Sequence, residues 1–274
     1  MLFSTQVNIP TSTVKLEPQD TLLFVGSCFA DNIGKRFAEN SFKATVNPYG
    51  VMYNPVSIRH TLDKLHQAET DSPSVALFTL GTNHVYREIA TGEIVDNCQK
   101  RPQKLFHEEI LSLEECTEAL QAIVSHPLLK RTKLIIFTVS PIRYKKYGYH
   151  ESQLSKATLL LAIDNLMQEK DSASCTQHFA LNYFPAYEIV LDELRDYRFY
   201  APDMIHPSEQ AVDYIFERFR ETCFSYSANT FYEEYQPIKQ ALNHKPFNPD
   251  SEDYKLFLEN AQKKLCDFKL KWNL

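Results

Sequence analysis

Two short stretches of the chain carry side chains that are able to do nucleophilic chemistry. The first is Gly26-Ser27-Cys28, where a hydroxyl and a thiol directly follow an apolar run. A residue between a buried strand and the next helix lies at the rim where doubly wound sheets bind ligands, and where free helix N–H groups attract negative charge. This placement suits a serine nucleophile at position 27. The alternative is that Ser27 only caps the following helix, which is a common role for serine.

The second stretch, APDMIHPSE at 201–209, places Asp203 and His206 three residues apart in front of a helix-like segment. Pro207 suits the first position of that helix and predicts His206 on its cap side. A histidine held there can accept the proton of a serine hydroxyl while a carboxylate orients its other ring nitrogen. Asp203 would supply that carboxylate. The alternative is a surface aspartate beside a capping histidine.

Cys28 is the rival nucleophile, because the N-terminus of a helix lowers the pKa of a thiol. A serine hydroxyl needs an external base, and the pair formed by Asp203 and His206 would supply one. The two assignments lead to different enzymes. On the residues alone, both remain open.

The elements that must position these side chains alternate between apolar runs and amphipathic stretches. Strands are expected at 22–25, 75–81, 133–141 and 178–184, and helices at 31–40, 112–124, 151–168 and 208–221. The helix at 112–124 begins with a capping box, Ser112 with Glu115. Continuous apolar strands separated by helices predict an α/β fold with a mostly parallel sheet covered on both faces. We expect a main domain at 1–224, and a helical extension at 225–274 that packs on it or on a partner chain.

Composition narrows the class of protein. The 274 residues are 43% hydrophobic with a net charge of −6, which supports a full core and gives no basic face for nucleic acid or anionic membranes. No apolar run approaches the ~18 residues of a membrane span, and no signal peptide is apparent. The six cysteines form no CxxC pair, and no metal-ligand spacing is present. We therefore expect a cytoplasmic protein that uses no metal or cofactor. The sequence indicates no particular oligomeric state.

Taken together, the two stretches resemble the GSCFA family, within the SGNH (GDSL-like) hydrolase superfamily. The residues Gly26 to Ala30 spell the name of the family. Five further stretches are similar to it: VNPYGVMYNP (46–55), FTLGT with the following VY (78–86), NCQKRPQKLF (97–106), FTVSPIR (137–143) and DELRDYRFYAPDMIHP (192–207). The resemblance covers about 1–225. It implies a three-layer α/β/α fold, with Ser27 as nucleophile, His206 as general base and Asp203 as its orienter.

The resemblance also implies an oxyanion hole. Its donors would be the backbone N–H groups of Ser27 and Gly50 and the side chain of Asn83, where Gly81-Thr82-Asn83-His84 fits three of the four positions of a Gly-x-Asn-Asp block. The alternative for Asn83 is a turn residue. Cys28 is then expected in the packing of the helix that presents Ser27.

Further residues of the family-like stretches are candidates for lining the pocket. These are Cys28, Gly81, His84, Asn97 and Arg143. His84 stands where the superfamily block has Asp, and we interpret it as a structural or pocket-lining residue.

The implied reaction is hydrolysis of an O-acyl ester of a small polar or carbohydrate-like alcohol. One rival is an O-acyltransferase, because a sugar hydroxyl can intercept the same acyl enzyme. The other is a non-catalytic module that binds an acyl group or a glycan. The second rival is motivated by the departure at His84 and by the segment between Asn54 and Phe78, which is shorter here than is usual in the family.

Overall fold

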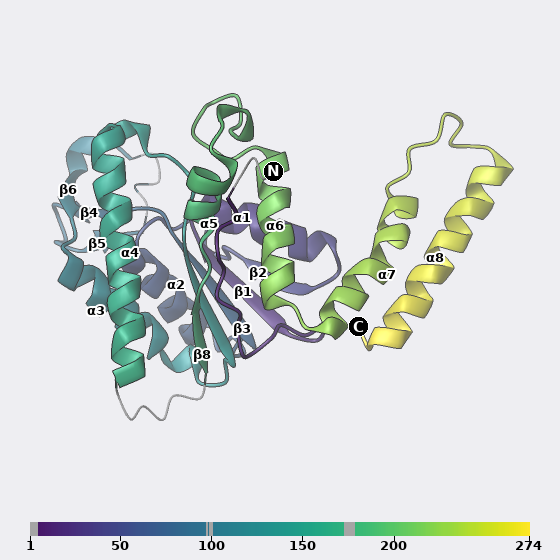
Figure 1. The fold of residues 1–274 in the computed structure, drawn as a ribbon, viewed down its shortest axis with the longest axis horizontal. Coiled ribbons are helices and arrows are strands. Elements are labelled where there is room, and N and C mark those ends of the chain that lie inside the picture. The colour runs from purple at the N-terminus through teal and green to yellow at the C-terminus, as the bar shows by residue number, and fades with distance from the viewer. Residues whose placement is uncertain (1–4, 97, 99–100, 173–178) are drawn as a thin grey trace.

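A five-stranded parallel sheet organises the chain in this computed structural model, which describes residues 5–96, 98, 101–172 and 179–274 (Figure 1). The strand order is β2-β1-β3-β7-β8, and every neighbouring pair is parallel. The strands are β1 (Thr21–Gly26), β2 (Lys43–Val46), β3 (Val75–Leu80), β7 (Leu134–Val139) and β8 (Ala180–Tyr183). β3 and β7 are buried along their whole length, which explains their unbroken apolar sequences. The predicted α/β fold is confirmed.

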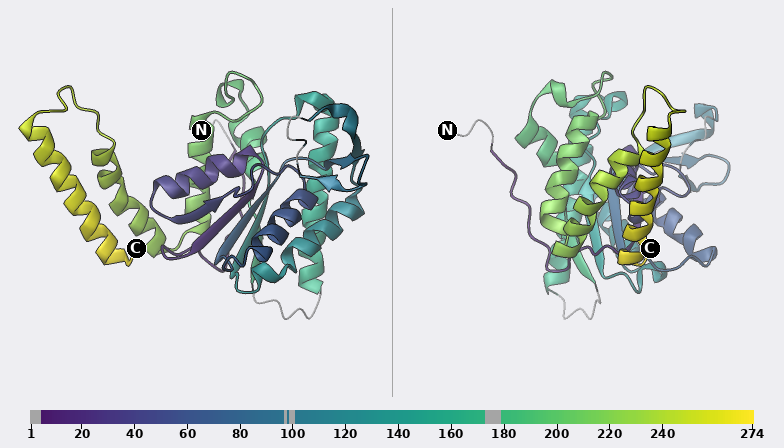
Figure 2. Two further views of the ribbon diagram at one scale, coloured as in Figure 1. Left: turned by 180° about the vertical axis from the view of Figure 1, so that it is seen from behind. Right: turned by 90° about the vertical axis from the view of Figure 1, so that its right-hand side faces the viewer.

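Helices cover both faces of the sheet (Figures 1 and 2). They are α1 (Cys28–Glu39), α2 (Pro55–Gln67), α3 (Leu113–Val124), α4 (Tyr149–Ser172), α5 (Ala186–Glu188), α6 (Glu209–Cys223), α7 (Tyr226–Leu242) and α8 (Glu252–Trp272). α1 and α6 lie on one face, and α2, α3 and α4 lie on the other. Among the described residues, no helix is both long enough and apolar enough to cross a membrane.

The alternation of side chains along the strands builds two cores. Leu22 and Phe24 of β1 point into the core shared with α1 and α6, whereas Leu23 and Val25 point into the core shared with α2, α3 and α4. In the first core Phe37 of α1 packs against five other phenylalanine rings. Because both faces of β1 are buried, the turn after Gly26 is held from both sides.

A second, antiparallel sheet was not predicted from the sequence. It has the order β5-β4-β6, formed by β5 (Ile94–Val95), β4 (His84–Glu88) and β6 (Phe106–Ile110). Its strands are short and carry many charged residues, so they lack the apolar run that marks the strands of the main sheet. Strand β2 and helix α2 were not predicted either.

Two helix starts test the capping predictions. The capping box of Ser112 and Glu115 is present at the start of α3. The prediction that Pro207 is the first residue of α6 is wrong: the N-cap is Ser208, whose Oγ accepts from the N–H of Ala211, and Pro207 lies outside the helix. Serine is favoured at an N-cap, and here this preference outweighs that of proline for the first helical position.

The C-terminal helices form an antiparallel hairpin that extends beyond the main sheet (Figures 1 and 2). α7 packs on the main core, where the ring centroid of Phe231 lies 4.8 Å from that of Phe42. α8 packs on α7 through Phe268 and Trp272, whose ring centroids lie 4.9 Å and 5.3 Å from that of Phe231. Residues 225–274 are thus joined to the main domain by aromatic contacts of α7.

Candidate active site

Ser27 lies at the carboxyl end of β1 and is the N-cap of α1. Its Oγ accepts from the N–H of Phe29 at 3.2 Å and lies 3.1 Å from Oγ1 of Thr79 on the neighbouring strand β3. The residue is completely buried. The structure therefore gives Ser27 the capping contact that the sequence allowed, at the rim where a nucleophile is also expected.

Gly26 allows β1 and β3 to approach closely at this point. Its φ is +146°, and a Cβ atom built on it would lie 2.2 Å from the carbonyl oxygen of Thr79. Asn47 secures the same turn, because its Oδ1 accepts from the N–H of Gly26 at 2.8 Å and its Nδ2 donates to Asp31 at 2.6 Å. A side chain at position 26 would displace the strand end that carries Ser27.

Asp203 and His206 form a hydrogen-bonded pair. The Oδ2 of Asp203 lies 2.6 Å from Nδ1 of His206, and its Oδ1 accepts from the N–H groups of Ile205 and His206 at 2.9 Å and 3.0 Å. The backbone N–H of His206, then its side chain, and the N–H of Ile205 lower the pKa of Asp203 to about 2. A carboxylate at Nδ1 requires the proton on that nitrogen, so Nε2 is the basic nitrogen of the neutral ring. Among the described residues, Nε2 has no partner.

The pair lies at the same edge of the sheet as Ser27. The N–H of Arg143, which follows β7, donates to the carbonyl of Ile205 at 3.1 Å. Only β3 separates β1 from β7, so their carboxyl ends are roughly 10 Å apart. Helix α6 also packs beside α1, where Arg36 pairs with Asp213 at 2.9 Å. Within the described part of the chain, no hydrogen bond joins Ser27 to His206.

The three predicted oxyanion donors are all engaged elsewhere. The N–H of Ser27 donates to Oγ1 and the carbonyl of Thr79 at 2.9 Å and 3.1 Å. The N–H of Gly50 donates to the carbonyl of Asn47 at 2.8 Å. Asn83 is buried, and its Nδ2 donates to the carbonyl of Leu111 at 2.7 Å. The structure therefore shows no preformed hole from these groups, and the oxyanion roles of Ser27, Gly50 and Asn83 stay predictions.

The predicted pocket residues are dispersed over two regions. Cys28 is half-buried, with Sγ 3.8 Å from the hydroxyl of Tyr53. His84 is buried in the small sheet, with Nδ1 3.2 Å from Glu108 and its ring stacked on Tyr147 at 3.8 Å.

Gly81 and Arg143 follow β3 and β7. A Cβ atom on Gly81 would lie 2.3 Å from the hydroxyl of Tyr144, and Arg143 contacts the loop that carries His206. The placement of Asn97 lies outside the described residues.

Sequence reasoning missed several residues that surround Ser27. Thr79 and Asn47 stand within the quoted family-like stretches, yet nothing in their spacing marks them as partners of Ser27 and Gly26. Tyr144 is also new: its hydroxyl is buried without a partner among the described residues, and burial raises its pKa well above the usual range.

Lys156 of α4 carries a completely buried amino group beneath this edge of the sheet. Its Nζ donates at 2.7 Å to the carbonyl of Gly81 and at 2.7 Å to that of Ser140, so it ties together the chain beyond β3 and β7. The Nζ also lies 5.1 Å from the ring centroid of Tyr144. Burial lowers the pKa of Lys156 to about 7. Within the described ranges, no group of three or more His, Cys, Asp or Glu side chains is arranged to hold a metal ion.

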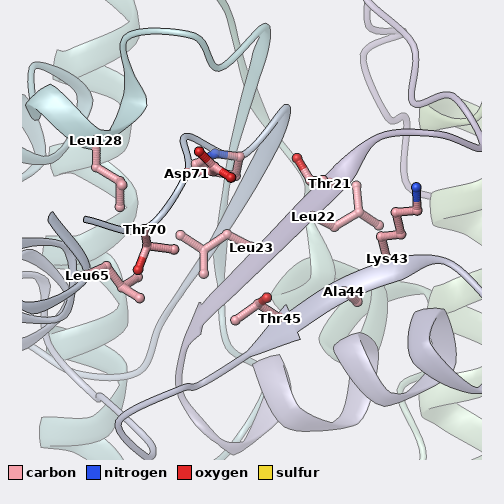
Figure 3. Close-up of a pocket in the computed structure, with 11 residues that line it drawn as sticks. Thr21, Leu22, Leu23, Lys43, Ala44, Thr45, Leu65, Thr70, Asp71 and Leu128 are labelled. Carbon is pink, nitrogen blue, oxygen red and sulfur yellow. The ribbon is translucent and has the colours of Figure 1, made fainter. Parts of the chain in front are cut away.

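A cavity of about 350 Å³ lies elsewhere, at the amino ends of β1 and β2 (Figure 3). Leu22 and Leu23 line it together with Thr45 of β2 and Leu65 of α2. Ser27 lies beyond the opposite end of β1. Ligands of parallel sheets bind at the carboxyl ends of the strands, so this cavity does not belong to the candidate active site.

Comparisons with known proteins place the sequence in a family. Residues 21–76 and 67–219 match the GSCFA family, and residues 235–274 match the GSCFA domain protein, C-terminal domain. These matches fall on either side of the predicted boundary between 224 and 225. No curated protein matches the chain.

Several solved structures are similar to this chain at low identity. A catalytic mutant of Axe2, an acetylxylan esterase from Geobacillus stearothermophilus, is 15% identical with a TM-score of 0.46, covering 77% of this chain and 98% of its own. The structure of TesA is 15% identical with a TM-score of 0.43, covering 74% and 97%. A carbohydrate esterase family 3 protein from Talaromyces cellulolyticus is 9% identical with a TM-score of 0.39, covering 73% and 94%.

Proposed function

The chain belongs to the GSCFA family, and we propose that it is a serine hydrolase of the SGNH type that cleaves carboxylic esters through an acyl enzyme. One observation carries this proposal. Asp203 holds Nδ1 of His206 at 2.6 Å and leaves Nε2 without a partner among the described residues, at the edge of the sheet where Ser27 follows β1. A base, its orienter and a hydroxyl are the three groups that acyl transfer to serine needs.

In the proposed reaction, Ser27 Oγ attacks the ester carbonyl carbon and its proton passes to Nε2 of His206. The tetrahedral intermediate expels the alcohol, which takes that proton. Water then attacks the acyl enzyme and gives its proton to Nε2. The second tetrahedral intermediate expels Ser27 Oγ, which takes that proton back, and the carboxylic acid is released. Asp203 stabilises the imidazolium formed in each half of the reaction. To reach the substrate, the hydroxyl of Ser27 must leave the contacts to Thr79 and Phe29.

The negative charge of the intermediate would be stabilised at the N-terminus of α1. The backbone N–H of Cys28 occupies the first helical position, where no carbonyl of the helix can accept from it. A helix N-terminus favours negative charge. Cys28 thus serves the proposed site through its backbone, whereas its thiol packs near Tyr53.

The proposed substrate is an O-acyl ester of a small polar or carbohydrate-like alcohol, as the resemblance to the superfamily implies. A fluorophosphonate probe tests the reaction, because it labels a serine only when that serine is activated. The wild type should be labelled at Ser27, and Cys28→Ala should be labelled equally. No labelling of the folded wild type, or equal labelling of Ser27→Ala, contradicts the hydrolase.

A second candidate is a non-catalytic binding module that keeps the hydrolase fold. The observation that favours it is the complete burial of Ser27, together with the engagement of its N–H by Thr79. The same probe separates the two candidates, because a binding module would leave Ser27 unlabelled.

A further inference from the structure

A cavity beside the loop of His206 presents two arginines that have no carboxylate partner in the part of the chain that the structure describes. It has a volume of about 260 Å³ and lies between the chain that follows β7 and the segment that follows the π-helical turn η4 (Ile189–Leu194). We call it the arginine pocket and define it by Arg143, Gln153, Arg195, Asp196, Tyr197 and Tyr200. We propose that the arginine pocket binds a carboxylate group of the ligand.

Arg143 forms one wall of the pocket. Its guanidinium lies 4.2 Å from the ring centroid of Tyr149 and 5.3 Å from that of Tyr200, so aromatic faces hold the planar group in place. Its Nη1 donates to the carbonyl of Met204 at 2.9 Å. Over the described ranges, Arg143 makes no ion pair. Its Nε and Nη2, which make no hydrogen bond in the described chain, therefore remain for a carboxylate.

Arg195 faces the same pocket from the end of η4. Its backbone adopts a left-handed conformation with φ of +47°, and its exposed side chain has no ion pair within the described chain. The acid that lines the pocket, Asp196, is already engaged: its carboxylate accepts from the N–H of Arg198 at 2.9 Å and lies 3.6 Å from Nε of Arg198. Asp196 therefore does not neutralise Arg195.

The charge of the pocket indicates an anionic ligand. Asp196 is paired with Arg198, so it offsets neither Arg143 nor Arg195 and the lining keeps an excess of positive charge. A planar carboxylate matches the planar fork of a guanidinium through two parallel N–H···O hydrogen bonds. The hydroxyls of Tyr197 and Tyr200 and the amide of Gln153 add polar groups for the rest of the ligand.

The pocket is part of the loop that carries the candidate base. Tyr200 forms an antiparallel bridge with Pro207, and the N–H of Ala201 donates to the carbonyl of His206 at 2.8 Å. The N–H of Arg143 donates to Ile205 from the other side. A carboxylate held by the pocket therefore lies beside the loop that carries His206. On the proposed function, on which this step rests, the arginine pocket selects esters whose acid or alcohol part carries a carboxylate.

A pair of acetate esters tests this selectivity. para-Acetoxybenzoate carries a carboxylate, and its methyl ester has the same acetyl group and ring without the charge. For the wild type, kcat/KM should favour the carboxylate. In Arg143→Gln and in Arg195→Gln, the ratio of the two kcat/KM values should fall at least about tenfold, as expected for the loss of one hydrogen bond to a charged group. Arg131→Gln, an exposed arginine near the amino end of β7, is the matched control and should keep the wild-type ratio.

Binding to Ser27→Ala separates this proposal from the proposed function. Calorimetry should show that para-acetoxybenzoate binds to Ser27→Ala and that additional replacement of Arg143 and Arg195 by Gln abolishes binding. If the wild type hydrolyses neither ester, the proposed hydrolase function is contradicted. The binding measurement still tests the arginine pocket in that case. An unchanged kcat/KM ratio in both arginine variants, or binding that survives their replacement, overturns the arginine pocket. Tighter binding of inorganic phosphate than of the carboxylate overturns the choice of anion.

Discussion

Asp203 Oδ2 lies 2.6 Å from His206 Nδ1, and the other oxygen of the same carboxylate accepts two backbone N–H groups of the same loop. The carboxylate therefore organises both the loop and the orientation of the imidazole ring. This double role makes the pair the most specific chemical feature of the candidate site.

Replacement of Asp203 tests this role in catalysis. Asp203→Asn should lower kcat for an acetate ester by roughly 10³-fold or more, because an amide no longer fixes the required tautomer of His206. The exposed Asp250, in the loop between α7 and α8, provides Asp250→Asn as a control that should keep wild-type turnover. Comparable activity of the two variants in a steady-state assay would show that Asp203 does not orient the base.

Gly26 should tolerate no side chain. Gly26→Ala combines an unfavourable φ with a contact of 2.2 Å to backbone, so the free energy of unfolding should fall by about 3 kcal/mol or more. Gly92 isolates the clash, because its φ is also positive at +74° while the added methyl would meet no atom within 4 Å. Gly92→Ala should cost only about 1 kcal/mol in urea unfolding. Equal losses in the two variants would contradict the close approach of β1 and β3.

Replacement of Asn83 tests whether its side chain is an oxyanion donor or a structural residue. Its buried amide donates to Leu111, so Asn83→Ala should lower the free energy of unfolding by about 1–3 kcal/mol by leaving that carbonyl unpaired. An oxyanion donor would instead cost roughly 10²-fold in kcat. We expect the loss of stability and a change in kcat below tenfold. A large fall in kcat with unchanged stability would restore the oxyanion assignment.

The hydroxyl of Tyr144 should contribute nothing to stability. It is buried without a partner in the described chain, so Tyr144→Phe should leave the free energy of unfolding unchanged or raise it. Tyr183 is the matched control, because its hydroxyl donates to Glu188 at 2.8 Å. Tyr183→Phe should cost about 1.5–3 kcal/mol. Thermal and urea unfolding of both variants provide the comparison, and a loss in Tyr144→Phe as large as that in Tyr183→Phe would contradict it.

Lys156 should make stability depend on pH. Burial lowers the pKa of its ammonium from 10.5 to about 7, so between these values the unfolded chain binds a proton that the native protein has lost. Stability must therefore rise with pH across this window. From about pH 7 to about pH 9, the wild type should gain about 2 kcal/mol relative to Lys156→Met.

Urea unfolding of both proteins at intermediate pH values measures this gain. The neighbouring Tyr187 does not interfere, because burial raises its pKa to about 12. Parallel pH curves for the two proteins would show that Lys156 keeps its proton in the native state.

The sequence alone predicted the elements whose signals are local. The apolar runs of β1, β3 and β7 and the amphipathic patterns of α3 and α6 marked them because burial on both faces, or on one face, selects residue types at fixed spacing. The small sheet was not predicted because the strands His84–Glu88 and Phe106–Ile110 are short and mix charged with apolar residues. Their pairing depends on a partner about twenty residues away.

The same division holds for the candidate site. The contact between Asp203 and His206 spans three residues of one loop, and the cap of Ser27 spans two, so residue type and spacing were sufficient to predict them. The roles proposed for these residues in catalysis stay predictions.

The tertiary structure alone decided the surroundings of Ser27 and His206. Thr79 contacts Ser27 because β1 and β3 are paired. Lys156 contacts Gly81 because α4 packs on the face of the sheet. Asn83 binds Leu111, and Arg143 binds the loop of His206, across contacts that no local pattern encodes. A donor that folding buries needs a hydrogen-bond acceptor. Which acceptor lies within reach depends on how the whole sheet and its helices pack together.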